Sequence, residues 1–117
     1  LGVSYLSISH DLGVVEFISH RVAVMYLGRI VEIAPKTKIF ASPTHPYTEL
    51  LMRSAPSHDP RKRHQFSATN DDIPSATRKP SGCPFHPRCP LATDICKQVD
   101  PALTPRDDGQ LVACHHR

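Results

Sequence analysis

The chain has 117 residues, about the size of one ordinary domain or of a small domain with an appendage. Its net charge of +3, with the histidines counted as neutral, is mild. The one basic run, residues 61–64, has no interleaved aromatic residue, which favours a solvated linker over a surface for acidic lipid or nucleic acid. No apolar run approaches the ~20 residues that cross a bilayer, so the sequence predicts no membrane-spanning helix.

The first residues alternate between apolar and polar side chains. The chain begins with Leu1 rather than Met and shows no signal-peptide pattern, so we expect it to be a piece of a longer protein. Residues 5–9 alternate as a strand does and lead into His10. Asp11 or Ser9 can cap the short amphipathic helix that we expect next.

Two runs rich in β-formers, residues 21–26 and 29–33, flank the pair Leu-Gly at 27–28. Glycine tolerates the positive φ that a tight hairpin needs, so the pattern predicts two antiparallel strands. A further helix is predicted over about residues 44–53, with Pro46 in its first turn.

The composition changes at residue 55, where Ser, Pro, His, Asp and Arg replace the apolar periodicity. We therefore predict a first domain at residues 1–54, a linker at 55–80 and a cysteine-rich module at 81–117. Within the module, a helix is expected near residues 91–99 and an extended piece at 110–114.

All four cysteines lie in this last segment, which has too few apolar residues to hold itself together by packing, so we expect a crosslink. Their gaps of five, six and seventeen residues do not match the closely spaced pairs of structural zinc sites. Iron–sulfur clusters accept irregular four-cysteine spacing. Zinc, free thiols and disulfides, which allow three pairings, are the alternatives. The candidate ligands are Cys83, Cys89, Cys96 and Cys114.

A strand leading into His10, a short helix and the hairpin run at residues 21–32 follow one another at the start of the chain. This order resembles the switch-histidine region of ABC-transporter ATPases, over about residues 1–34. In that family the histidine contacts the γ-phosphate and the attacking water, so the resemblance implies that His10 is catalytic and binds nucleotide. His20, at a helix end, is expected to be structural only.

Three further segments, residues 42–51, 82–90 and 113–115, resemble the C-terminal extension of the ATP-binding subunits of dipeptide and oligopeptide importers. The implied fold class is α/β: the C-terminal part of an ABC-type P-loop nucleotide-binding domain, followed by a small irregular cysteine-ligated module. Similar importer subunits carry a [4Fe–4S] cluster in this extension, which implies that the four cysteines are its ligands. His86, His115 and His116 are expected beside the metal or facing solvent, and His45 receives no catalytic role.

The resemblance also implies the setting of the whole protein. By this resemblance it is expected to be a bacterial peptide importer subunit that hydrolyses ATP with Mg²⁺ and couples hydrolysis to peptide uptake. Its partners are a second ATPase subunit, the membrane permease subunits and, through the assembled transporter, an extracellular or periplasmic peptide-binding protein, with no nucleic acid. It is peripheral, at the cytoplasmic face of the inner membrane.

The residues present lack the Gly-rich phosphate loop, the signature sequence and the strand with the Mg²⁺-binding Asp and catalytic Glu. The chain by itself is therefore predicted to be inactive as an ATPase. The alternative function is a small non-enzymatic metal-binding or redox-sensing protein, in which the N-terminal half is only a scaffold.

Overall fold

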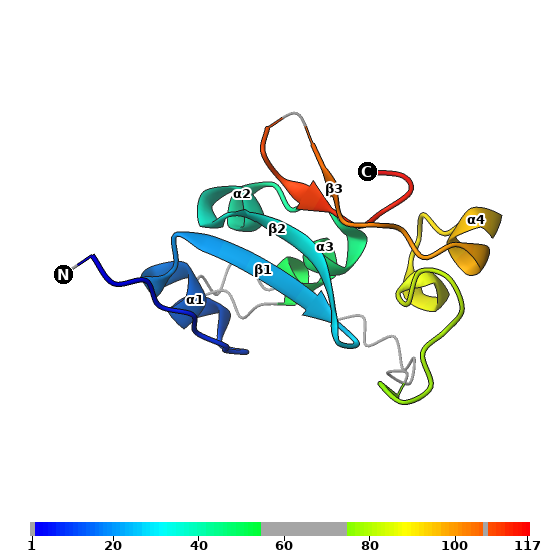
Figure 1. Ribbon diagram of the computed structural model, residues 1–117, viewed down its shortest axis with the longest axis horizontal. Coiled ribbons are helices and arrows are strands. Elements are labelled where there is room, and N and C mark those ends of the chain that lie inside the picture. The colour runs from blue at the N-terminus through cyan, green and yellow to red at the C-terminus, as the bar shows by residue number, and fades with distance from the viewer. Residues whose placement is uncertain (1, 55–74, 107) are drawn as a thin grey trace.

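The computed structural model describes residues 2–54, 75–106 and 108–117. Most of the predicted linker, with the basic run at residues 61–64, lies outside the described residues, and the predicted domain boundaries stay a prediction. Figure 1 shows the elements, which are α1 (Leu12–Ile18), β1 (Arg21–Tyr26), β2 (Arg29–Pro35), α2 (Lys36–Ala41), α3 (Pro46–Ser54), the 3-10 helix η2 (His86–Arg88), α4 (Asp94–Gln98), β3 (Thr104–Pro105) and β4 (Leu111–Val112).

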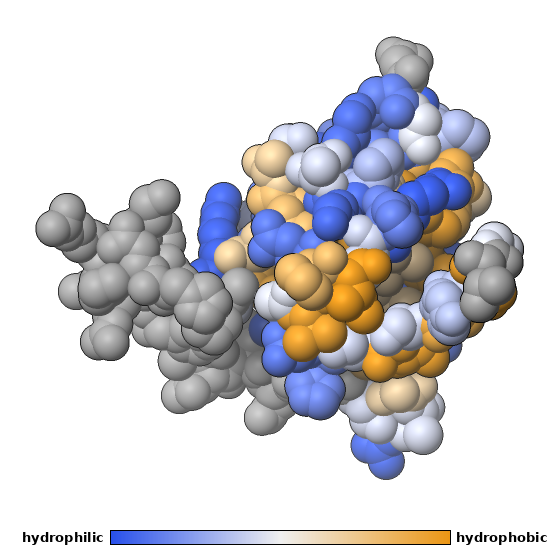
Figure 2. All heavy atoms as spheres, turned by 90° about the vertical axis from the view of Figure 1, so that its left-hand side faces the viewer, coloured by the Kyte–Doolittle hydropathy of each residue, from blue (hydrophilic) through white to orange (hydrophobic). Residues whose placement is uncertain are grey.

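The N-terminal segment differs from the prediction in one respect. The helix α1 is confirmed, and Asp11 caps it by accepting from the backbone N–H groups of Gly13 and Val14 at 3.0 and 3.2 Å. The strand predicted at residues 5–9 is wrong in this structure, because no described segment pairs with it. Its apolar side chains are therefore left in solvent, on a face where apolar atoms gather (Figure 2).

The predicted hairpin is confirmed. β1 and β2 pair antiparallel, and Leu27 and Gly28 both have positive φ, 47° and 78°, as a tight two-residue turn requires. A register shift after Val24 places two consecutive β2 residues, Val31 and Glu32, in the buried interior. This irregularity breaks the usual alternation and turns an acidic side chain inward.

The sheet combines two strands from the first part of the chain with two from the last part. Its order is β1-β2-β4-β3 and every described pairing is antiparallel, with β4 of the cysteine segment adding to the open edge of β2. Two ion pairs, Arg29 with Asp100 and Lys38 with Asp108, also join the first part of the chain to the cysteine segment. The coarse prediction of a small fold with mixed helices and sheet is therefore confirmed.

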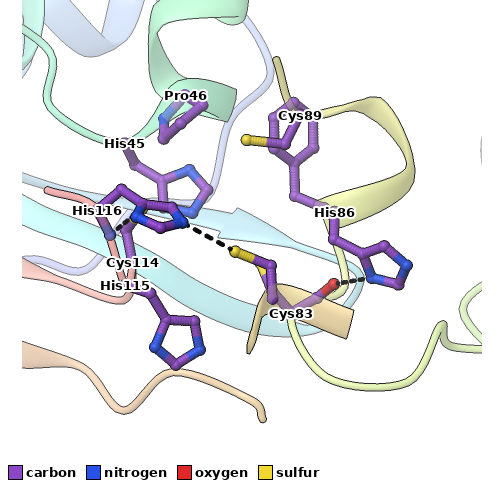
Figure 3. A pocket seen from close by; sticks show the side chains of 10 residues that line it. His45, Pro46, Cys83, His86, Cys89, Cys114, His115 and His116 are labelled. Carbon is purple, nitrogen blue, oxygen red and sulfur yellow. Dashed lines mark hydrogen bonds between the residues drawn. The ribbon is translucent and has the colours of Figure 1, made fainter. Parts of the chain in front are cut away.

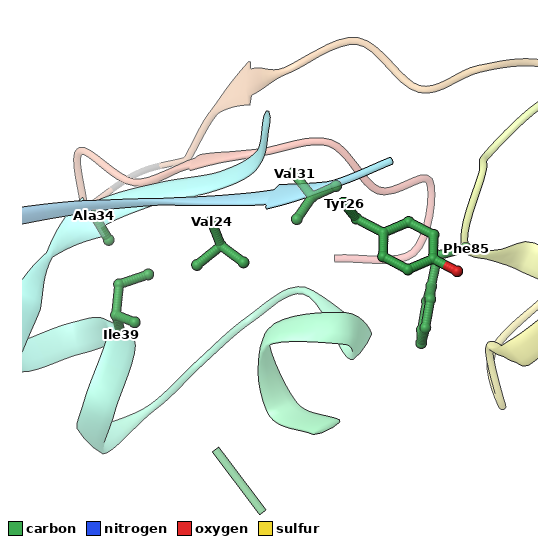
Figure 4. Close-up of a cluster of buried hydrophobic side chains, with 6 residues drawn as sticks. All are labelled: Val24, Tyr26, Val31, Ala34, Ile39 and Phe85. Atoms are coloured by element: carbon green, nitrogen blue, oxygen red, sulfur yellow. The ribbon is translucent and has the colours of Figure 1, made fainter. Parts of the chain in front are cut away.

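The core lies between the sheet and the helices α2 and α3, which cover one of its faces (Figure 4). Phe85, from the proline-rich loop between the first two cysteines, is only 2% exposed and closes one end of this core. Its ring lies edge-on to Tyr26 with 5.4 Å between centroids, and 5.5 Å from the ring of Tyr47 on α3. The cysteine segment is thus anchored by a side chain that it inserts into the main core.

The remaining elements follow the prediction loosely. α3 matches the helix predicted with Pro46 in its first turn, α4 is shorter than the predicted stretch at 91–99, and β4 lies in the predicted extended piece. The strand β3 and the helix α2 were not predicted. Among the described residues, no helix combines the length and apolarity that a membrane crossing requires.

Candidate metal centre

The four cysteines line one small cavity of about 10 Å³, which is room for roughly one water molecule (Figure 3). They come from three places in the fold: two flank η2, one lies in α4 and one follows β4. None forms a disulfide. The structure therefore brings together all four predicted ligands, which are Cys83, Cys89, Cys96 and Cys114.

Gly82 allows the loop that carries Cys83 to meet the end of α4. The backbone N–H of Cys83 donates to the carbonyl oxygen of Cys96 at 2.8 Å. Gly82 has a φ of 70°, and a Cβ atom built there would lie 2.4 Å from that same carbonyl oxygen. Only a residue without a side chain permits this approach, which sets the separation of two candidate ligands.

Replacing Gly82 with alanine is expected to lower the free energy of unfolding by about 1–3 kcal/mol, because it combines backbone strain with a backbone clash. Gly109→Ala is the matched control, since Gly109 has a φ of 82° and nothing within 4 Å of a built Cβ. Denaturant unfolding of both variants measures the difference. Equal losses of stability would show that the close approach at Gly82 contributes nothing.

The cavity favours the protonated form of two of its thiols, those of Cys83 and Cys89. Burial, the largest cause, raises the pKa of Cys83, and the neighbouring Cys114 and Cys96 raise it further. Burial likewise raises the pKa of Cys89. Four thiolates gathered here therefore need a compensating positive charge, which a metal centre supplies.

The three histidines that were predicted to lie beside the metal line the same cavity, but their rings have different hydrogen-bond partners. His86 and His115 form hydrogen bonds to backbone carbonyl groups, those of Cys83 at 2.8 Å and Val99 at 2.7 Å. His116 is the one that reaches a candidate ligand: its Nε2 lies 3.4 Å from the sulfur of Cys96. The expectation that these rings sit beside a metal rather than ligate it stays a prediction.

The arrangement does not by itself form a metal-ion site. Within residues 2–54, 75–106 and 108–117, no three His, Cys, Asp or Glu side chains are grouped as one metal ion requires. A single zinc ion would need sulfur atoms at about 2.3 Å from one centre. The donor set fits a four-cysteine cluster in kind and number, but the predicted cysteine-ligated module is not supported by the geometry as it stands.

Sequence reasoning gave no role in this site to His45, which lines the cavity, or to Glu32, which binds the backbone of His45. Glu32 is fully buried, and its two side-chain oxygens accept from the backbone N–H groups of Thr44 and His45, each at 3.0 Å. His45 is 1% exposed, and burial lowers its pKa to about 4, so the ring is neutral at pH 7. An acidic residue within an apolar strand was the available signal, because a buried carboxyl group needs partners.

His10 lies apart from this cavity. It is exposed, precedes the capping Asp11, and belongs to the end of the molecule that carries α1, whereas α4 lies at the other end (Figure 1). It does not line the cysteine cavity. Its predicted catalytic role stays a prediction.

Comparison with known proteins identifies the family. A family model described as the C-terminal region of the oligopeptide/dipeptide transporter matches residues 31–96, more than half of the chain. A probable peptide ABC transporter ATP-binding protein of Sinorhizobium fredii is 54% identical over 116 residues, 99% of this chain and 33% of that protein. A dipeptide transport ATP-binding protein of Haemophilus influenzae is 45% identical over 99% of this chain and 36% of its own length.

A putative peptide import ATP-binding protein of Brucella abortus is 49% identical over 98% of this chain and 34% of its own length. The chain therefore spans about a third of the length of the curated relatives that it matches. The family match includes most of the hairpin strand β2, helix α3 and three of the four cysteines. The chain belongs to the family defined by the C-terminal region of oligopeptide and dipeptide transporters.

Proposed function

We propose that this chain is the C-terminal part of the ATP-hydrolysing subunit of a bacterial dipeptide or oligopeptide importer, in which ATP hydrolysis is coupled to peptide uptake. The observation that carries the proposal is the 54% identity, over 99% of the chain, to a probable peptide ABC transporter ATP-binding protein. The relatives named for dipeptide transport and peptide import agree with it.

In this function His10 is the residue that acts on the nucleotide. It directly precedes the capped helix α1 and is exposed, so its ring is accessible to a phosphate held by another part of the protein. The exposed side chains of Tyr5, Leu6 and Ile8 support the interpretation that this segment pairs with strands supplied from elsewhere. ATP and Mg²⁺ would be bound mainly by that remaining part.

The proposed partners follow from the same function. They are a second ATPase subunit, a pair of membrane permease subunits and a peptide-binding protein that delivers the cargo to the transporter. The subunit would lie peripherally on the cytoplasmic face of the inner membrane. The names of the relatives, which describe ATP-binding proteins of peptide ABC transporters, support this placement.

Cys83, Cys89, Cys96 and Cys114 would hold a [4Fe–4S] cluster in this subunit. A cluster is wider than one ion, so its thiolates lie further apart than those of a zinc site. The support for the proposal is that all four thiols line one cavity, and zinc is the alternative metal for the same ligand set. When bound, the group would supply a one-electron redox centre that also crosslinks the segment to the core.

The proposal is tested with a chimaera that joins the preceding part of the Sinorhizobium fredii relative to this chain. The chimaera is expected to release phosphate from ATP with Mg²⁺, whereas the chain alone is expected to match a mock preparation, because the chain has no phosphate loop. A chimaera that folds and binds nucleotide but does not hydrolyse it would favour the small metal-binding protein instead.

A further inference from the structure

One wall of the cysteine cavity comes from the C-terminal segment. His115 and His116 line the cavity on the side opposite the loop that carries Cys83 (Figure 3). The pairing of this segment with the sheet stops just before them, at Ala113, whose N–H donates to a carbonyl oxygen of β2 at 2.8 Å. Within residues 2–54, 75–106 and 108–117, no hydrogen bond between backbone groups involves residues 115–117. These three residues are called the strap.

The two histidines of the strap are held by their rings. Nε2 of His115 donates to the backbone carbonyl oxygen of Val99, just after α4, at 2.7 Å. Nε2 of His116 lies 2.8 Å from Oγ1 of Thr93 and 3.4 Å from the sulfur of Cys96. Both rings therefore fasten the strap to α4 and its ends, and the ring of His116 contacts the one cysteine of the four that is buried.

The third residue of the strap is fastened to a different helix. Nη2 of Arg117 donates to Oε1 of Glu49, on α3, at 3.2 Å. Arg117 and His116 are exposed, and polar contacts between exposed side chains contribute little each, because water competes for the same groups. Release of the strap breaks only such contacts and leaves every strand pairing in place, so it requires local opening rather than unfolding.

Thr93 holds His116 with a hydroxyl group that its helix does not use. Thr93 is the N-cap residue of α4, but its side chain makes no capping hydrogen bond. Threonine at this position ordinarily accepts from the free N–H groups of the first turn. Here the hydroxyl is turned to the ring of His116 instead. The end of α4 thus provides a fastening point for the strap.

The other walls of the cavity are held more firmly. Phe85 is 2% exposed in the main core, and the loop that carries it is joined to α4 by the bond from the N–H of Cys83 to the carbonyl oxygen of Cys96. His45 and Pro46, which also line the cavity, are buried at the start of α3. The cavity has room for about one water molecule, so a larger group reaches the thiols only if a wall moves. The strap is the wall with the fewest contacts to break.

We propose that the strap is a lid over the cysteine cavity, which opens by releasing its side-chain contacts while the sheet and core stay folded, and which controls access to Cys96. The inference deepens the proposed cluster site and rests on it for its purpose, since a metal would reach the thiols through this opening. The lid itself belongs to the metal-free chain, because all of its contacts are made between residues of the protein. It is therefore tested without metal.

Two substitutions loosen the strap at separate points. Thr93→Val removes the hydroxyl that holds His116, keeps the shape of the side chain and costs α4 no cap. Arg117→Ala removes the contact with α3. Arg53→Ala is the matched control, because Arg53 also lies 3.9 Å from Glu49 but belongs to α3 rather than to the strap. A chain that ends at Cys114 lacks the strap altogether and defines the open state.

Each chain is purified with a reductant and a chelator, and iodoacetamide labelling of every cysteine is followed by peptide mass spectrometry. We expect Thr93→Val to speed the labelling of Cys96, relative to Cys83 and Cys89, by about three- to tenfold, the effect of losing one hydrogen bond. Arg117→Ala should speed it by about two- to fivefold, and Arg53→Ala should leave it unchanged. The chain without the strap should label Cys96 fastest. Denaturant unfolding of the same proteins should show little change in the midpoint.

An unchanged rate at Cys96 in the chain without the strap would overturn the proposal. An equal rise at all four cysteines, together with a lower unfolding midpoint, would also overturn it, because general loosening of the fold would then explain the labelling. Iron and sulfide content, measured on a separate anaerobic preparation, tests the cluster. Absence of iron there would remove the cluster and leave the labelling result as evidence on the lid, so the two failures are distinguishable.

Discussion

Replacing His10 with alanine in the chimaera of the Sinorhizobium fredii relative and this chain is expected to lower kcat for ATP hydrolysis by about 10²–10³-fold. The imidazole is proposed to donate to charge that develops on the γ-phosphate and to orient the attacking water, and both interactions strengthen in the transition state. Nucleotide affinity should change by less than about threefold, since the ring contributes little to ground-state binding. Phosphate release and nucleotide titration measure the two quantities.

His20→Ala is the matched control for this variant. His20 stands between α1 and β1, and its backbone carbonyl accepts from the N–H of Lys36 at 3.0 Å. Its loss should leave kcat within about twofold. An unchanged kcat in the His10 variant, or equal losses in both, would return His10 to a structural role.

Replacing Cys114 with serine is expected to remove the cluster from anaerobically purified protein. Cys114 is the candidate ligand that follows β4, so through it the C-terminal segment would join a cluster held by the cysteines of the proline-rich loop and α4. The parent should contain about four iron and four sulfide per chain with broad visible absorption, and the variant well under half of that. Loss of the cluster should also reduce hydrogen-exchange protection of residues 81–117, because binding and folding are coupled.

His115→Asn is the control for the Cys114 variant, because it changes a neighbour that binds the carbonyl group of Val99 and leaves all four thiols in place. It should keep the iron. Stoichiometric zinc without sulfide in the parent would contradict the cluster but preserve a four-cysteine site. Unchanged iron in Cys114→Ser would remove Cys114 from the ligand set.

Local features of the fold were predictable because local physics determines them. The hairpin follows from two runs of β-formers around Leu27 and Gly28, whose positive φ values match the turn that those residues favour. Asp11 capping α1 follows from the chemistry of a side chain that accepts from free N–H groups. The four cysteines line one cavity but are not grouped to hold a metal ion, so their predicted role as ligands stays a prediction.

Contacts between distant parts of the chain were not predictable. β4 pairs with β2, and Phe85 enters the core from a segment that sequence composition described as unable to pack by itself. The pairing of Glu32 with His45 depends on a register shift in the hairpin, which no local pattern signals. The strand predicted at residues 5–9 is absent from the structure. An alternating pattern forms a strand only where a partner strand is present.

Peptide uptake by cells tests the central claim most directly. The chimaera is expressed in a strain that lacks the corresponding importer ATPase, and uptake of a radiolabelled dipeptide and tripeptide is measured against the intact Sinorhizobium fredii relative. The proposed function predicts uptake that depends on the chimaera and is lost in its His10→Ala variant. A chimaera that accumulates at the membrane and hydrolyses ATP but restores no uptake of either peptide would contradict it.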